Sequence, residues 1–327
     1  MKTASSLLRS IVFVATVVSA APTLETSLFA RQAISTLSTA QIASFKPFSF
    51  FASAAYCQPA RTLAWSCGAN CNANADFIPT ASGGDGSSTQ FWYVGFSPSQ
   101  NSVIVAHQGT DTSKIQALLT DAEAVRGKLD ASLFPGVPSA VTVHDGFRDE
   151  HAKTAPTILA AVQRTLSAHP ASKRVTVVGH SLGTPGSFFL LQWLNTGAGA
   201  ALALLDGVYL PLHISGVTFR TIGYGMPRVG NQDFANYVDS HISLTHINNR
   251  EDFVPILPGR FLGYSHPAGE VHIQDSGAWT SCPGQDNTNS ACTVGDVGNI
   301  FEGHAGDHSG PYDGELSAIS ASDNQRN

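Results

Sequence analysis

A short apolar run followed by a serine between two glycines constrains the fold of this chain more than any other stretch. Residues 175–183 read VTVVGHSLG, so that four apolar or β-branched residues precede the pattern G-x-S-x-G around Ser181. The run suits a buried strand. The pattern is that of a nucleophile elbow, in which a strand turns sharply into a helix with the serine at the turn. Gly179 and Gly183 remove β-carbons where strand and helix crowd. An ordinary glycine-rich turn is the alternative, so the pattern needs context.

Composition and the order of the elements supply that context. The chain has 327 residues, of which 43% are hydrophobic and 13% charged, as in a compact globular protein. Its net charge of −6 argues against nucleic acid as a partner. Strand-like stretches at 91–96, 102–106, 217–222 and 244–247 alternate with helix-like stretches such as 147–166. We therefore expect a single α/β domain with a central, mostly parallel sheet flanked by helices.

The amino-terminal residues have the character of a secretory leader. Positive charge precedes an apolar core at 11–18, and the small-residue sequence Val-Ser-Ala ends at position 20. The apolar core is shorter than the roughly 20 residues that a membrane-spanning helix needs. We expect residues 1–20 to be a signal peptide, 21–31 a short propeptide and 32–327 the mature domain, secreted and extracellular.

Five cysteines in a secreted chain predict disulfides with one cysteine left over. Cys67 and Cys71 are close enough in sequence to close a small loop, as are Cys282 and Cys292. Cys57 is then unpaired. Zinc is the alternative for such pairs, but a secretory leader favours disulfides.

Several further blocks, in a fixed order, extend the elbow into a family resemblance. They are AYC at 55–57, AHQGT at 106–110, VHDGF at 143–147, MPRVGN at 226–231, the stretch 248–258, GYSHP at 263–267 and DH at 307–308. Together they resemble the fungal class 3 lipase family, secreted α/β-hydrolases, over about residues 45–314. The resemblance implies an α/β-hydrolase fold and a serine ester hydrolase that acts on acylglycerols without a cofactor or metal ion.

A serine hydroxyl becomes nucleophilic when a histidine removes its proton and a carboxylate fixes the histidine tautomer. In α/β-hydrolases these residues follow in the order serine, acid, histidine. Ser181 is the candidate nucleophile. Asp252 follows the strand-like stretch 244–247 and matches the acid position of the family. Glu251 is the neighbouring alternative, and Asp206 and Asp233 are weaker ones.

The histidine is chosen from those that follow the acid. They are His266, His272, His304 and His308. The block DHSGPY at 307–312 resembles the catalytic-histidine block of the family, so we assign His308, with His304 second. His180, beside the serine, is expected to pack under the elbow.

Two backbone donors are needed for the negative charge that develops during ester cleavage. The N–H of Leu182, next after the nucleophile, is one. By resemblance Thr110 is the other, through its N–H and its hydroxyl, although 109–110 on its own reads as a plain turn. Residues 113–125, with apolar side chains at helical spacing, fall where the family carries a lid that opens on a lipid surface. An ordinary surface helix is the alternative.

The chain departs from the family at two places. Residues 184–199 interrupt it directly behind the nucleophile, and without them Gly183 joins Ala200 in an ordinary elbow helix. We interpret 184–199 as an insertion, such as a retained intron, and predict weak activity or misfolding. The family usually pairs the cysteine at Cys57 with one near the C-terminus, and none follows the catalytic-histidine block in this chain.

The leading hypothesis is a secreted triacylglycerol lipase-like enzyme that forms an acyl-enzyme intermediate. The alternatives are a feruloyl-type esterase of plant cell-wall esters and an inactive, lipid-binding homologue. The expected partner is a lipid or ester substrate at an oil–water interface, contacted transiently through the lid, by a monomer.

Overall fold

The computed structural model describes residues 33–109, 125–181 and 199–313, which belong to one compact unit, Ala33–Asn327. Within these residues a nine-stranded sheet has the order β1-β11-β10-β9-β8-β7-β4-β3-β2. Its strands are β1 Ser35–Thr36, β2 Ile78–Gly83, β3 Trp92–Ser97, β4 Ser102–His107, β7 Arg174–His180, β8 Thr218–Tyr224, β9 Leu244–Asn249, β10 Glu270–Ile273 and β11 Trp279–Cys282.

The centre of this sheet is parallel, and its edges are antiparallel. Strands β4, β7, β8, β9 and β10 run parallel to one another, whereas β2, β3, β11 and β1 pair antiparallel. A parallel sheet is covered on both faces, so its strands are largely buried. In β7 every residue after Arg174 is buried. The expected fold class, a large and mostly parallel sheet flanked by helices, is confirmed.

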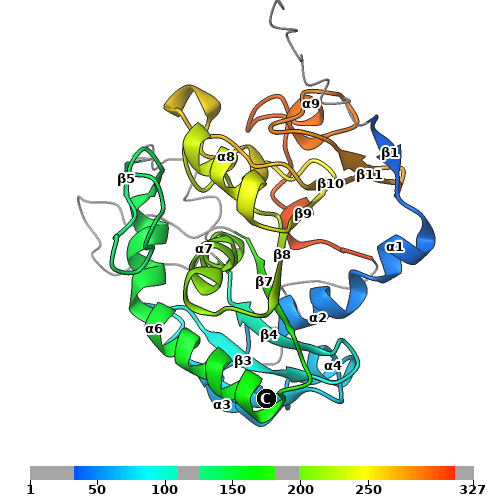
Figure 1. Cartoon of the computed structure of the whole chain (residues 1–327). Coiled ribbons are helices and arrows are strands. Elements are labelled where there is room, and N and C mark those ends of the chain that lie inside the picture. The colour runs from blue at the N-terminus through cyan, green and yellow to red at the C-terminus, as the bar shows by residue number, and fades with distance from the viewer. Residues whose placement is uncertain (1–32, 110–124, 182–198, 314–327) are drawn as a thin grey trace, which may run out of the picture. The chain divides into compact units, whose positions relative to one another are not determined.

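Helices cover both faces of the parallel strands. α6 Asp145–Ala168 and α7 Gly199–His213 lie on one face, and α2 Lys46–Ala54 lies on the other (Figure 1). The remaining elements are α1 Thr39–Ala43, α3 Pro59–Leu63, α4 Ala69–Asn72, α8 Gln232–His241, α9 Thr293–Asp296, the 3-10 helices η2 Val254–Ile256, η3 Arg260–Leu262 and η4 Asp307–Ser309, and a two-stranded sheet of β5 Arg126–Lys128 and β6 Thr142–His144. None of the described helices combines the length and the apolar character needed to cross a bilayer.

Helix α7 is the most deeply buried helix on the α6 side. It is apolar on all sides except for Asp206, and the residues from Gly199 to Leu210 are buried. A helix without a polar face is stable only inside a core. It packs against α6, β7 and β8 in a cluster that also contains Val175 and Val177 of β7. This packing fixes the position of α7 directly behind the C-terminal end of β7.

One of the two expected disulfides is present in the structure. The disulfide between Cys282 and Cys292 is confirmed. The expected loop between Cys67 and Cys71 is wrong, because both carry free thiols, as does Cys57, and all three are buried. The thiol of Cys67 lies between the other two and shares hydrogen bonds with both, which raise its pKa. Because three thiols adjoin one another, closeness in sequence was not enough to predict a disulfide between two of them.

Candidate active site

Ser181 occupies a strained turn at the C-terminal end of β7. Its φ of +73° lies in the left-handed region, which is uncommon for a residue with a side chain. The turn is held on both sides: the Ser181 N–H donates to the Tyr224 carbonyl (2.8 Å), and the Ala200 N–H donates to the Ser181 carbonyl (3.0 Å). Ser181 is fully buried. A nucleophile elbow has this backbone.

The helix behind the serine begins at Gly199. A β-carbon on Gly179 would lie 2.0 Å from the Gly199 carbonyl oxygen, so the strand needs a glycine there. A β-carbon on Gly199 would lie 2.6 Å from the His180 carbonyl oxygen. The close approach of helix and strand thus involves Gly179 and Gly199. Gly183, the glycine named by the sequence pattern, lies outside the described residues.

The structure brings together the three side chains that the sequence named as a triad. The Ser181 Oγ lies 2.5 Å from the His308 Nε2, and the His308 Nδ1 lies 2.8 Å from the Asp252 Oδ2. All three residues have no exposed surface. Ser181 follows β7, Asp252 lies in the loop after β9, and His308 belongs to the short helix η4. The C-terminal ends of parallel strands meet at one edge of the sheet, which is where α/β folds place their sites.

Asp252 is fixed by the backbone around it. Its N–H donates to the Asn249 carbonyl (3.0 Å), and its Oδ1 accepts from the Val254 N–H (2.9 Å). One carboxylate oxygen is thereby occupied, and the other faces His308. Because an ionised carboxylate only accepts, the proton of His308 sits on Nδ1. The lone pair of Nε2 then points at the Ser181 hydroxyl, which is the arrangement that general-base catalysis requires.

The alternative acids lie elsewhere. Glu251 forms an ion pair with His304, whose side chain is exposed. Asp206 is buried beneath the sheet edge between two histidines. Asp233 lies in the first turn of α8 and accepts a hydrogen bond from Asn231. None of the three is bonded to His308.

The other histidines that follow Asp252 are bonded away from Ser181. His266 and His272 are buried, and each bonds to a backbone carbonyl through its Nε2. His304 is the histidine of a small surface cluster with Glu251 and Asp307, whose ligand-type atoms lie within 4.8 Å of one another. That cluster is the only described group of three such side chains able to hold a cation, since the other group contains the Cys282–Cys292 disulfide.

His180 connects the elbow to the loop that carries His308. Burial, with a smaller contribution from the neighbouring His308, lowers its pKa to about 3, so the ring is neutral at ordinary pH. Its Nε2 lies 2.8 Å from the His308 carbonyl oxygen, and its Nδ1 lies 2.6 Å from the Tyr56 hydroxyl. A neutral ring satisfies both when Nε2 donates and Tyr56 donates to Nδ1. The expected packing of His180 under the elbow is confirmed.

The sequence reading did not anticipate the tyrosines around this bridge. The Tyr312 hydroxyl donates to the same His308 carbonyl (3.3 Å), from four residues downstream. Tyr56 lies in the AYC block and Tyr312 in the DHSGPY block. The family motifs therefore identified these segments but did not reveal what the two tyrosines do. Together the bridge and Tyr312 hold the backbone of His308.

Two glycines allow the triad to close. Gly225, just after β8, has a φ of +54°, and a β-carbon there would lie 2.7 Å from the His308 Cε1 and 3.0 Å from the Asp252 Oδ2. A β-carbon on Gly109, just after β4, would lie 2.8 Å from the Ser181 Cβ and 2.1 Å from the His180 carbonyl oxygen. Any larger residue at either position would push directly on the reacting side chains.

A buried charge network supports the end of β4. The Asp206 carboxylate accepts from the His107 Nε2 (2.7 Å) and the His151 Nε2 (2.8 Å). Burial raises the pKa of Asp206, but the hydrogen bonds from both histidines outweigh it and bring the pKa to about 2. The network ties α7, β4 and α6 together beneath the loop that leads to the expected oxyanion donor.

The expected oxyanion donors, Thr110 and Leu182, lie outside the described residues, as do the expected lid apart from Val125 and the expected insertion apart from Gly199. The residue two before Thr110 is fixed: the Gln108 N–H donates to the Phe91 carbonyl (2.8 Å), and its side-chain oxygen accepts from the Phe91 N–H (3.0 Å).

Comparison with known proteins gives consistent results. The profile of the family described as lipase (class 3) matches residues 104–262. Over 208 residues the chain is 33% identical to the secreted mono- and diacylglycerol lipase MDL2 of Malassezia globosa, covering 62% of each protein. Over 244 residues it is 32% identical to the secreted mono- and diacylglycerol lipase MDL3 of the same organism, covering 71% of this chain and 74% of the relative.

A solved structure shares the fold. The triacylglyceride lipase of Rhizomucor miehei superposes with a TM-score of 0.70 at 25% identity. The superposition covers 88% of this chain and the whole of that one.

Proposed function

Because the chain belongs to the class 3 lipase family, we propose that it is a secreted serine ester hydrolase that cleaves acylglycerols through an acyl-enzyme intermediate. The observation that carries the proposal is the buried chain of hydrogen bonds from Ser181 through His308 to Asp252. The relatives named above, which are mono- and diacylglycerol lipases, support acylglycerols as the substrate class.

The chemistry follows from the positions of the protons. The Ser181 Oγ attacks the ester carbonyl carbon while its proton moves to the His308 Nε2. The imidazolium that forms is stabilised by the Asp252 carboxylate 2.8 Å from its Nδ1. When the tetrahedral intermediate collapses, this proton passes to the leaving glyceryl oxygen, and an acyl group stays on Ser181. Water then attacks the acyl-enzyme with His308 again acting as the base, and the fatty acid is released.

The negative charge on the carbonyl oxygen needs donors beside Ser181. We assign this role to the backbone N–H groups of Thr110 and Leu182, with the Thr110 hydroxyl as a further donor. Support comes from the fixed position of Gln108, two residues before Thr110. Removing one such donor typically costs a factor of about 100 to 1,000 in kcat.

We assign residues 113–125 to a lid that opens at an oil–water interface, where the monomeric enzyme meets its substrate. The support is the helical spacing of Ile115, Leu118 and Leu119. The expected signature is a sharp rise in the hydrolysis rate once a short-chain triglyceride exceeds its solubility. A rate that follows the dissolved concentration smoothly through that limit would remove the lid assignment.

We further propose that residues 1–20 are removed on secretion and that residues 21–31 are a propeptide. The compact unit begins at Ala33, close to the expected start of the mature domain. Amino-terminal sequencing of the secreted protein tests both cuts: Ala21 is expected after the first and Gln32 after the second. A mature protein that still began within the first 20 residues would contradict the signal peptide.

The decisive experiment combines covalent labelling with substrate competition. The purified chain is treated with a fluorophosphonate probe, and the labelled peptide is identified by mass spectrometry. We expect the label on Ser181, and its loss in Ser181→Ala. Hydrolysis of emulsified triolein and diolein is then compared with hydrolysis of methyl ferulate.

Each outcome discriminates between the hypotheses. Labelling with preferential cleavage of the acylglycerols supports the proposal. Preferential cleavage of methyl ferulate would make the protein a feruloyl-type esterase with the same triad. A folded chain that binds lipid vesicles but takes up no label would be an inactive, lipid-binding homologue. A matched circular dichroism spectrum for Ser181→Ala controls for unfolding.

A further inference from the structure

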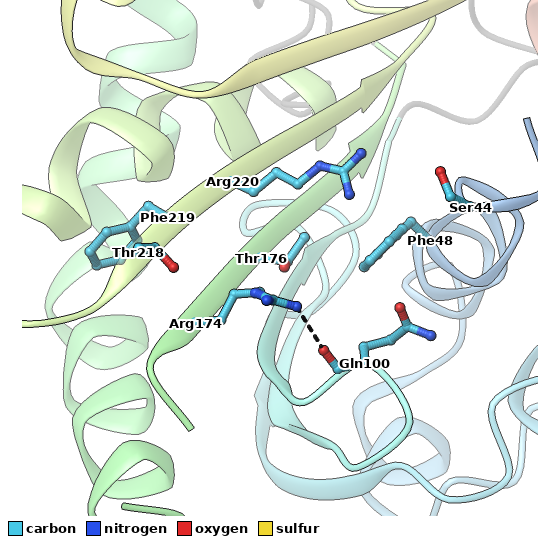
Figure 2. A pocket seen from close by; sticks show the side chains of 8 residues that line it. All are labelled: Ser44, Phe48, Gln100, Arg174, Thr176, Thr218, Phe219 and Arg220. Atoms are coloured by element: carbon cyan, nitrogen blue, oxygen red, sulfur yellow. Dashed lines mark hydrogen bonds between the residues drawn. The ribbon is translucent and has the colours of Figure 1, made fainter. Parts of the chain in front are cut away.

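A pocket lined by two arginines lies at the amino-terminal ends of β7 and β8, on the edge of the sheet opposite Ser181 (Figure 2). Its cavity measures about 260 Å³, and its lining includes Phe48, Gln100, Arg174, Thr176, Thr218 and Arg220. Since a strand rises about 3.3 Å per residue, Arg174 and Ser181 lie roughly 20 Å apart along β7. The pocket is therefore separate from the candidate active site.

The strand register gathers the polar side chains on one face. Arg174 of β7 lies beside Thr218 of β8, and Thr176 lies beside Arg220. Because side chains alternate along a strand, these four residues share a face, with the arginines on one diagonal and the threonines on the other. Figure 2 shows both arginines extending toward Phe48 and Gln100.

Arg220 is held in place without using its hydrogen-bond donors. Its guanidinium carbon lies 5.2 Å from the centre of the Phe45 ring and 5.4 Å from that of Phe48. Stacking on aromatic faces fixes the guanidinium plane and leaves its N–H edge free. The residue is half-buried, and its side chain forms no hydrogen bond or ion pair with a described residue.

Arg174 is similarly available. Its one side-chain hydrogen bond to a described residue is a long one, from Nη1 to the Gln100 carbonyl oxygen (3.3 Å). No described carboxylate forms an ion pair with either arginine. Burial lowers the pKa of Arg220, and the like charge of Arg174 lowers it further. Two neighbouring cations that no described carboxylate neutralises, in a partly closed cavity, would both be stabilised by an anion.

We propose that this pocket binds a phosphate group, either as inorganic phosphate or carried on a small molecule or a lipid headgroup. A phosphate dianion matches the two guanidinium charges, and guanidinium groups recognise phosphate through paired N–H donors. The Gln100 side chain adds a further polar contact at the rim. The cavity lies below the roughly 300–1,000 Å³ of sites for drug-sized ligands, so its volume suits a small group such as phosphate.

The test uses binding to the full-length chain, measured by calorimetry at constant ionic strength. The probes are inorganic phosphate, glycerol 3-phosphate and phosphatidylcholine vesicles with and without phosphatidic acid, with chloride as the reference anion. Arg174→Gln and Arg220→Gln are made singly and together. Arg164→Gln, which removes an exposed arginine from α6 on the other side of the sheet, is the matched control.

We expect saturable binding of at least one phosphate probe, with Kd raised about tenfold by each single substitution and unchanged in Arg164→Gln. Arg174 is exposed, so its variant tests the site even if Arg220→Gln lowers stability. Binding of the soluble phosphates identifies a free ligand, and binding only to phosphatidic acid vesicles identifies a headgroup. Phosphate binding no stronger than chloride, or equal in the double variant, overturns the proposal. Ester hydrolysis of a soluble substrate is expected to be unaffected by the substitutions.

Discussion

Replacing Gly225 by alanine is expected to disable the triad while leaving its three members in the chain. A β-carbon there would lie 2.7 Å from the His308 Cε1 and 2.9 Å from its Nδ1. Carbon atoms in contact prefer about 3.5–4.0 Å, so the imidazole must move by about 1 Å. The ring cannot retreat freely, because its two nitrogens are bonded to Ser181 and Asp252 and its backbone carbonyl is bonded to His180.

A misplacement of this size costs about 100-fold in rate, or about 2.7 kcal/mol of transition-state stabilisation. The assay is kcat/KM on soluble p-nitrophenyl butyrate, with the melting temperature measured in parallel. Gly216→Ala is the control, since Gly216 also has a positive φ, +76°, but no atom lies within 4 Å of an added β-carbon. Both variants bear a similar left-handed backbone penalty of about 1–2 kcal/mol. If Gly225→Ala kept kcat/KM within about threefold of Gly216→Ala, the proposed dependence on triad geometry would be wrong.

Three further results are expected. Asp206→Asn should lower the free energy of unfolding at pH 7 by about 3–5 kcal/mol. Because the folded-state pKa of Asp206 is depressed to about 2, this advantage of the wild type should shrink as pH falls from about 4 to about 2, and urea unfolding at several pH values would measure it. Tyr56→Phe removes the donor to His180 and should lower kcat more than it changes KM; equal kcat would show that the bridge is not needed to position the histidine loop. Deleting residues 184–199 should raise ester hydrolysis, and equal rates with and without them would refute the interpretation as a harmful insertion.

The central sheet could be predicted because its residues are patterned by burial alone. The strands β3, β4, β7, β8 and β9 fall on the stretches that alternation and apolar runs indicated. The edge strand β2 was not found, because it contains Pro79 and Gly83, residues that are typical of turns. An edge strand tolerates a proline, whose missing N–H is not needed on the unpaired side, so its pairing depends on β3 rather than on its own composition.

The candidate triad could be named because two kinds of information coincided. The elbow pattern identified Ser181, and motif order selected Asp252 and His308 from several acids and histidines. Periodicity alone would not have separated His308 from His304, since the two are four residues apart. The tertiary structure separates them: His304 is exposed beside Glu251, and His308 is buried against Ser181. The predicted Cys67–Cys71 disulfide was wrong because three buried thiols adjoin one another and distance in sequence does not rank them, whereas the Cys282–Cys292 disulfide was predicted correctly.

The sequence analysis predicted either weak activity or misfolding as a result of the insertion, and the structure distinguishes between these two consequences. Tethering α7 to β7 through the longer segment 182–198 costs about 2–3 kcal/mol of loop-closure free energy. The helix buries large apolar side chains, among them Leu202, Leu204 and Leu205, each of which contributes about 1.5–3 kcal/mol on transfer from water. Docking of α7 therefore outweighs the longer tether, and the Ala200 N–H still bonds to the Ser181 carbonyl. Misfolding is thus the weaker consequence. The stronger one concerns the N–H of Leu182, the expected oxyanion donor next to Ser181, so we expect the insertion to act on kcat rather than on stability.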